Sequence, residues 1–312
     1  MGRRAQRARG ANQRGEYLRA SAPKPVELSH GVRGISARNA VTRSLPIDRP
    51  RRGRVHVTPV QQFTDKVVMV TGADGGIGSQ IASQFAAAGA RVYLSGVHAE
   101  SGRELAARLG SKATSIELDV RSEAQWKTAI ASVLATHGRL DILVNNAGYL
   151  KPGLSIENTS IADWRQHYAV NADGPFLGCK HAILAMKDRG GGAIVNIGSA
   201  VAMRLHADSP AYGASKAAAI ALTRIAAIHC GQNKYSIRVN AVLPGPIDTA
   251  MMRSNAATAA EFEKLEAMLI RKYPMERIGL PADIANAVLF LASGQASYVN
   301  GACFAVDGGQ SA

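Results

Sequence analysis

The chain has 312 residues, of which 46% are hydrophobic and 19% are charged. This composition excludes wholesale disorder, and it favours one α/β domain of about 250 residues with an appendage. The formal charge of +14 is concentrated in residues 1–62, where 13 Arg and one Lys oppose three acidic residues. The rest of the chain is nearly neutral, which argues against a nucleic-acid-binding domain.

Residues 1–62 mix Arg, Gly, Ser, Pro and Ala without a sustained helical or alternating apolar pattern. We expect a disordered, basic N-terminal extension. Three origins are open: a plain extension from a start codon assigned too early, a targeting peptide, or an arm for nucleic acid or another anionic surface. The acidic residues and the missing apolar helical stripe count against the targeting peptide.

From residue 63 onward, short apolar runs alternate with helical patterns, as in successive βαβ units. Strands are expected at residues 67–70, 91–95, 114–118, 141–145, 193–197, 236–242 and 303–306. Helices are expected at residues 77–88, 100–109, 122–136 (capped by Ser122), 161–187, 211–230 and 281–292. This alternation predicts an α/β fold, a single doubly wound Rossmann-type domain over residues 63–312 with a seven-stranded parallel sheet.

The three cysteines, Cys179, Cys230 and Cys303, stand far apart and form no CxxC pair or Cys/His cluster with zinc spacing. We therefore expect neither a disulfide framework nor a metal site, and a reducing compartment such as the cytoplasm fits. Lys216 and Arg224 interrupt the longest apolar stretch, so no membrane span is expected.

A glycine cluster separates the first expected strand from the first expected helix. Residues 71–78 read Thr-Gly-Ala-Asp-Gly-Gly-Ile-Gly. Glycines in this position allow backbone amides to approach a pyrophosphate, and the helix N-terminus adds unpaired N–H groups and a partial positive charge. The context of strand, glycine loop and helix predicts a dinucleotide-binding site.

The end of the second strand commonly distinguishes NAD from NADP, because an acidic residue there favours NAD and a nearby Arg favours NADP. Gly96 and its neighbours provide neither signal. Gly75 leaves the glycine loop without a basic side chain, and Asp74 would repel a 2′-phosphate. These residues favour NAD, with NADP left open. His98 could contact a phosphate, although an exposed loop histidine is the simpler interpretation.

Tyr212 and Lys216 stand four residues apart in an expected helix and therefore share one face. A neighbouring ammonium favours the phenolate, so we expect Lys216 to lower the pKa of Tyr212. A tyrosine with a lowered pKa can exchange a proton with an alcohol near neutral pH. Ser199 ends the fifth expected strand, at the sheet edge where ligands bind, and it could hold the oxygen of a substrate beside Tyr212.

The chain resembles the short-chain dehydrogenase/reductase family over residues 63–312. The resemblance rests on motifs in order and at the family's spacing: residues 71–78 (TGxxxGIG), Asp119, residues 145–148 (NNAG), Asn171 (NxxGxF), Ser199, Tyr212 with Lys216 (YxxxK), and residues 244–249 (PG…T).

This resemblance implies a role for each matched residue. Tyr212 is expected to act as general acid/base, Lys216 to lower its pKa and bind the ribose, and Ser199 to orient the substrate oxygen. Asn171 is expected to hold a water that links Lys216 to bulk solvent. Cofactor contacts are expected from Gly72, Asp74, Gly76, Ile77, Gly78, Asp119, Val120, Asn145, Ala147, Gly148, Tyr212, Lys216, Pro244, Gly245, Ile247 and Thr249.

The resemblance also implies an oxidoreductase that interconverts a secondary alcohol and a ketone with NAD or NADP. Residues 228–252 and the ending at residues 305–310 are similar to NAD-linked hydroxysteroid and alicyclic alcohol dehydrogenases of the family, which implies an apolar substrate. Segment 250–273 stands where such enzymes carry a substrate lid, and its methionines could line an adaptable pocket. Family members commonly form homodimers or homotetramers through the helices corresponding to residues 161–187 and 211–230.

Three alternatives remain open at this stage. An NADPH-dependent 3-oxoacyl thioester reductase would need a basic residue near the glycine loop, and Gly75 does not supply one. A dinucleotide-binding regulator without turnover would be expected to have lost Tyr212 or Lys216, and both are present. A third alternative adds nucleic-acid binding by the basic extension to an enzyme body.

Overall fold

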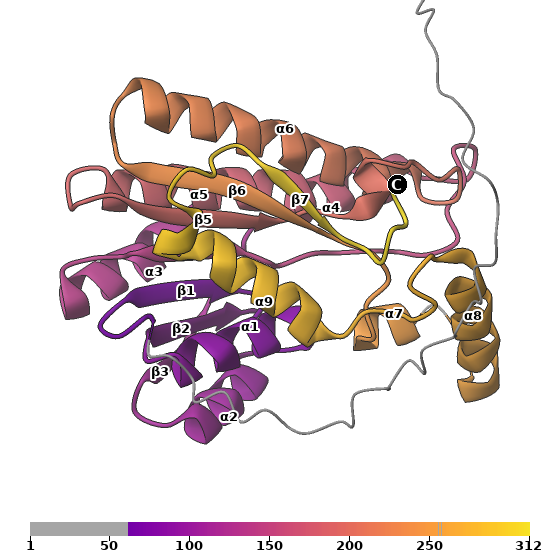
Figure 1. Ribbon diagram of the computed structural model, residues 1–312, viewed down its shortest axis with the longest axis horizontal. Coiled ribbons are helices and arrows are strands. Elements are labelled where there is room, and N and C mark those ends of the chain that lie inside the picture. Colours follow the sequence, from indigo (N-terminus) through magenta and orange to yellow (C-terminus); the bar gives the residue numbers. More distant parts are fainter. Residues whose placement is uncertain (1–61, 255, 257) are drawn as a thin grey trace, which may run out of the picture. The chain divides into compact units, whose positions relative to one another are not determined.

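The computed structural model describes residues 62–254, 256 and 258–312 (Figure 1). Almost all of the predicted extension at residues 1–62 lies outside the described residues. Within them, one seven-stranded, all-parallel sheet has the order β3-β2-β1-β4-β5-β6-β7. The strands are β1 (Val67–Thr71), β2 (Arg91–Gly96), β3 (Ala113–Glu117), β4 (Ile142–Asn145), β5 (Gly192–Ile197), β6 (Ile237–Pro244) and β7 (Cys303–Val306).

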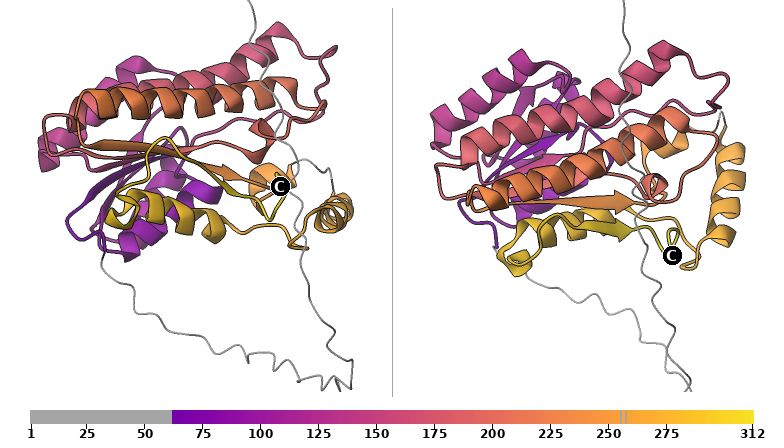
Figure 2. Two further views of the ribbon diagram at one scale, coloured as in Figure 1. Left: turned by 45° about the horizontal axis from the view of Figure 1, so that its top comes forward. Right: turned by 90° about the horizontal axis from the view of Figure 1, so that it is seen from above.

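Helices cover both faces of this sheet (Figure 2). They are α1 (Gly76–Ala87), α2 (Ala99–Leu109), α3 (Glu123–His137), α4 (Ile161–Tyr168), α5 (Gly174–Met186), α6 (Pro210–Gln232), α7 (Ala250–Arg253), α8 (Ala259–Lys272) and α9 (Pro281–Ala292). None of these helices in the described part of the chain is long and apolar enough to cross a membrane.

The two faces of the sheet carry separate hydrophobic cores, which explains why the first four residues of β1 are all apolar. Val68 and Val70 pack with residues of α1, α2 and α9, whereas Val67 and Met69 pack with residues of α3, α5 and α6. Successive side chains of a strand point to opposite faces, so a strand covered on both sides is apolar at almost every position. The predicted doubly wound fold is confirmed.

The strand order reverses between β1 and β4, which are neighbours although β2 and β3 separate them in the chain. In such sheets, ligands bind beyond the carboxyl ends of the strands at this switch point. The loops after β1, β4, β5 and β6 therefore define the region in which a site is expected.

The predicted single helix at residues 161–187 is wrong in one respect. A π-helical segment, Ala169–Asp173, separates α4 from α5. Pro175 has no N–H to donate to the carbonyl four residues earlier, and the hydrogen bond from the Gly174 amide to the Ala169 carbonyl spans five residues instead. The segment contains Asn171, and such π-bulges are frequent at functional sites.

Candidate active site

Ser199, Tyr212 and Lys216 meet beyond the carboxyl end of β5. Ser199 follows this strand, and its hydroxyl accepts a hydrogen bond from the Val201 amide at 3.2 Å. Tyr212 and Lys216 lie in the first turns of α6, with the Lys216 ammonium 5.9 Å from the centre of the Tyr212 ring. The predicted juxtaposition of these three side chains is therefore present.

The electrostatics differ from the sequence-based expectation. Burial of the Tyr212 hydroxyl raises its pKa, and a hydrogen bond with Ser199 partly opposes this shift. Burial lowers the pKa of Lys216 to about 8. The ammonium of Lys216 donates a hydrogen bond to the Ile197 carbonyl at 2.9 Å. In the chain alone, desolvation therefore outweighs the hydrogen bond with Ser199, and the pKa of Tyr212 is raised rather than lowered as the sequence suggested.

Asn171 connects the segment after β4 to α6 beside these side chains. Its side-chain oxygen accepts from the Tyr149 amide at 2.8 Å, and its side-chain nitrogen donates to the Tyr149 carbonyl at 2.9 Å and to the Ser215 hydroxyl at 3.1 Å. A Cβ added to Gly148 would lie 3.5 Å from the Lys216 ammonium and 3.6 Å from the Asn171 side-chain oxygen. Asn171 and Lys216 thus converge on Gly148.

Asn146 and Thr71 join the loop after β4 to the glycine loop. The Asn146 side chain donates to the carbonyls of Thr71 and Gly72, at 2.8 and 3.0 Å. The Thr71 hydroxyl accepts from the amides of Asn146 and Ala147, at 3.0 Å each. Ala147 therefore lies beside the loop predicted to hold a pyrophosphate.

Asn145 occupies a different environment from its neighbours. Its side chain is buried, and it donates to the Asn196 side-chain oxygen at 2.8 Å. A Cβ on Gly178 would lie 2.2 Å from the Asn145 side-chain oxygen, which shows how closely α5 approaches β4 there. This placement joins Asn145 to the packing of the sheet, and its contact with a cofactor stays a prediction.

The glycine loop fits the pyrophosphate of a dinucleotide. A Cβ on Gly78 would lie 2.1 Å from the Gly72 carbonyl oxygen, whereas a Cβ on Gly75 would meet no atom within 4 Å. Gly75 precedes α1 without a side-chain cap, and the first turn of this helix, which includes Gly76 and Ile77, has no acidic residue. The helix therefore presents its first N–H groups and positive dipole end to open space.

The segment after β6 approaches this loop from the other side. Thr249 caps α7 by accepting from the Met252 amide at 3.2 Å, and its methyl carbon lies 3.4 Å from where a Cβ of Gly76 would stand. The Ile247 backbone bridges to Gly279. Pro244 and Gly245 lie where β6 ends, at the same edge of the sheet. The structure thus places Thr249 beside the glycine loop, and the contacts of Pro244, Gly245 and Ile247 with a cofactor stay predictions.

Asp119 and Val120 follow β3, two strands away from β1. The Asp119 carboxylate accepts hydrogen bonds from the Arg121 guanidinium, which holds the pKa of this carboxyl below its usual value. The Val120 carbonyl accepts from the Trp126 indole at 3.0 Å, so this backbone is fixed by α3. Contacts of Asp119 and Val120 with an adenine stay predictions.

Tyr149 and His167 are site residues that the sequence motifs did not identify. The His167 ring lies 4.9 Å from the Tyr149 ring and 6.5 Å from the Tyr212 ring, measured between centres. The buried His167 contacts the Asp163 carbonyl through Nδ1 at 2.7 Å and accepts from the Lys151 amide through Nε2 at 3.2 Å. The position of Tyr149 directly after Gly148 was a signal available in the sequence.

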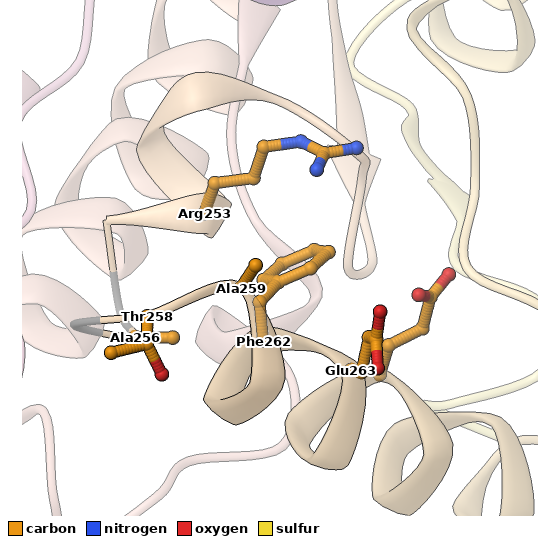
Figure 3. Close-up of a pocket in the computed structure, with 7 residues that line it drawn as sticks. Arg253, Ala256, Thr258, Ala259, Phe262 and Glu263 are labelled. Atoms are coloured by element: carbon orange, nitrogen blue, oxygen red, sulfur yellow. The ribbon is translucent and has the colours of Figure 1, made fainter.

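A pocket lies within the predicted lid (Figure 3). Arg253 of α7 lies over the Phe262 ring at 4.7 Å, and its guanidinium donates to the Asp248 carboxylate at 2.8 Å. Met252 packs with Phe262 and Ile278 in a small core of the lid. Met252 thus serves packing, whereas Met251 and Met268 are exposed.

Comparisons with known proteins agree with this geometry. A family model described as enoyl-(acyl carrier protein) reductase matches residues 72–311. The chain is 37% identical over 239 residues to a 3-beta-hydroxysteroid dehydrogenase of Comamonas testosteroni, covering 76% of this chain and 92% of that protein. It is 36% identical over 254 residues to a 2,5-dichloro-2,5-cyclohexadiene-1,4-diol dehydrogenase of Sphingobium indicum, covering 80% and 98%.

A solved structure shows the same fold. The ligand-free aldohexose dehydrogenase of Thermoplasma acidophilum superposes with a TM-score of 0.73 at 38% identity, covering 80% of this chain and 94% of that chain. The family match spans both the glycine loop and the Tyr212/Lys216 pair. The chain belongs to the short-chain dehydrogenase/reductase family and is an NAD(P)-dependent oxidoreductase that interconverts alcohols and ketones.

Proposed function

We propose that this enzyme acts on an apolar, alicyclic secondary alcohol or the corresponding ketone, with Tyr212 as the general acid/base. The observation that carries the proposal is the meeting of Ser199, Tyr212 and Lys216 beside an open glycine loop. A nicotinamide ring, when bound, exchanges the hydride with the carbon of the alcohol or ketone.

The side chains of the site transfer the proton and orient the reactants. Tyr212 gives a proton to the ketone oxygen or takes one from the alcohol. Ser199, which already hydrogen-bonds Tyr212, orients the same oxygen. The Lys216 ammonium stabilises the phenolate and binds the ribose, and the polar contacts of Asn171 support a water that connects Lys216 to solvent.

The apolar character of the substrate is supported by the segment between Ser199 and Tyr212. Met203 and Leu205 expose 56% and 68% of their surface, and a Cβ on Gly213 would lie 3.4 Å from the Leu205 side chain. Exposed apolar side chains beside polar catalytic groups are typical of small-molecule sites. The relatives named for a hydroxysteroid and a cyclohexadienediol agree with this class, and they disfavour 3-oxoacyl thioester reduction.

We further propose NAD as the preferred cofactor, because no basic side chain stands at Gly75 in the glycine loop. The predicted organisation keeps residues 63–312 as the catalytic domain with the lid at 250–273, and residues 1–62 as an appended basic extension in a cytoplasmic protein. A homodimer or homotetramer through α4, α5 and α6 completes the proposal.

The test follows absorbance at 340 nm with the full chain, NAD or NADP, and alcohols that include cyclohexanol and a hydroxysteroid. Tyr212→Phe should lower kcat by at least about a hundredfold while dinucleotide affinity stays within about twofold, since the phenol transfers a proton and only flanks the cofactor. Tyr298→Phe, a change at a fully exposed tyrosine, should leave both quantities unchanged. Full turnover by Tyr212→Phe would refute the assigned role.

A further inference from the structure

Asp74 of the glycine loop is fixed against the end of β2. The neighbouring Ala73 amide donates to the Ser95 carbonyl at 3.2 Å, and the His98 amide donates to the Asp74 carboxylate at 3.3 Å. The first hydrogen bond fixes the backbone of the glycine loop, and the second fixes the Asp74 carboxylate. The half-buried Asp74 carboxylate is therefore held against the end of β2.

Gly96, the last residue of β2, makes room for this carboxylate. A Cβ built on Gly96 would lie 2.9 Å from the carboxyl carbon of Asp74 and 3.0 Å from each of its oxygens. These separations are closer than van der Waals contact, so any larger residue at 96 would displace Asp74. The carboxylate thus occupies the volume in which a side chain of residue 96 would begin.

The end of the second strand is where a Rossmann-type fold reads the 2′ position of the adenosine ribose. We propose that Asp74 is the specificity-determining residue there, accepting a hydrogen bond from the 2′-hydroxyl of NAD and repelling the 2′-phosphate of NADP. This inference rests on the proposed preference for NAD. The absence of an acidic residue at Gly96 is then explained, because the loop after β1 supplies the carboxylate that β2 lacks.

Arg121, a positive charge in the loop after β3, is already paired with a carboxylate. Arg121 follows β3, the register neighbour of β2, and its Nε and Nη2 both donate to the Asp119 carboxylate. A guanidinium held in this way has fewer donors left for a 2′-phosphate. This pairing agrees with a site that selects a neutral hydroxyl.

The experiment measures dissociation constants of NADH and NADPH by titration calorimetry on the full chain, without substrate. Asp74→Asn keeps the size of the side chain and removes its charge, so the ratio of the two constants should shift toward NADPH by about tenfold or more. Glu117→Gln, at the exposed register partner of Gly96, is the matched control and should change the ratio less than about twofold.

A double variant that moves the carboxylate from residue 74 to residue 96 controls for general damage to the binding site. Asp74→Gly combined with Gly96→Asp returns the acidic group to the strand, and the double variant should keep the preference for NADH. An unchanged ratio in Asp74→Asn, or equal wild-type affinity for both dinucleotides, overturns the inference. The binding measurement contains no alcohol, so it does not depend on the substrate. If every tested alcohol fails to react, the proposed substrate class is contradicted, but a shifted ratio of dissociation constants still supports the role of Asp74.

Discussion

The catalytic role proposed for Lys216 comes at a cost in stability. Its ammonium is almost fully buried, and its described partner is the carbonyl of Ile197. The same burial that lowers its pKa raises that of Tyr212. Desolvation thus disfavours the charged form of both the phenol and the amine. A nearby opposite charge, or a hydrogen bond from the ribose of a bound dinucleotide, would counteract these shifts.

The pKa of Lys216 predicts a pH-dependent stability. The folded chain releases this proton near pH 8, whereas the unfolded chain holds it to about pH 10.5, so the unfolded state binds more protons between these values. Stability should therefore rise with pH in this window, by up to about 3 kcal/mol from this group. Urea unfolding of the wild type and Lys216→Met, without dinucleotide, should reveal the gain as a difference between the two proteins.

The control for this measurement is Lys180→Met, which removes an exposed lysine paired with Glu123. Its unfolding free energy should follow the wild type across the same pH range. Parallel curves for the wild type and Lys216→Met would contradict the assigned pKa.

At the scale of elements, local patterns predicted almost every strand and helix, because burial on both faces demands apolar strands and the connections are short. The expected strand at residues 303–306 and helix at 281–292 match β7 and α9. The break at Asn171 had a local signal in Pro175, which has no N–H for the carbonyl of residue 171. The hydrogen bonds of the Asn171 side chain to Tyr149 and Ser215 were not predictable, because these residues lie far away in the chain. The sequence indicated that Asp74 would repel a 2′-phosphate, but the close packing of its carboxylate against Gly96 could be seen only in three dimensions.

The packing of α5 on β4 gives a second prediction, at Gly178. Its added Cβ would lie 2.2 Å from the buried side-chain oxygen of Asn145, which hydrogen-bonds through its nitrogen to Asn196. Gly178→Ala should lower the free energy of unfolding by about 1–3 kcal/mol, because overpacking forces backbone or side-chain shifts. Gly231→Ala in α6 is the matched control, since its Cβ meets nothing within 4 Å.

The control should be as stable as the wild type or up to about 1 kcal/mol more stable, because alanine favours helix more than glycine does. Urea unfolding monitored by circular dichroism measures both changes. Equal stability of Gly178→Ala and Gly231→Ala would show that α5 can move away from β4 without cost.

At the scale of the whole molecule, α5 and α6 lie side by side over one face of the sheet (Figure 2), and both helices expose large apolar residues. Phe176 and Leu184 of α5 expose 52% and 50% of their surface, and Ile225 and Ile228 of α6 expose 64% and 59%. Scattered exposed apolar residues are ordinary, but four large ones on two adjacent helices agree with the proposed association through α5 and α6. This surface coincides with the helices through which a homo-oligomer is proposed.

The corresponding prediction concerns the mass of the particle in solution. A charge placed in an apolar contact must be desolvated without a partner, so Leu184→Glu combined with Ile225→Glu should convert the oligomer into smaller species. Light scattering coupled to size-exclusion chromatography measures the mass directly. Met268→Glu, at an equally exposed apolar residue of α8, should leave the mass unchanged. If the wild type is a monomer, or if the double variant keeps the oligomeric mass, α5 and α6 do not form the contact, and their apolar sides require a different partner.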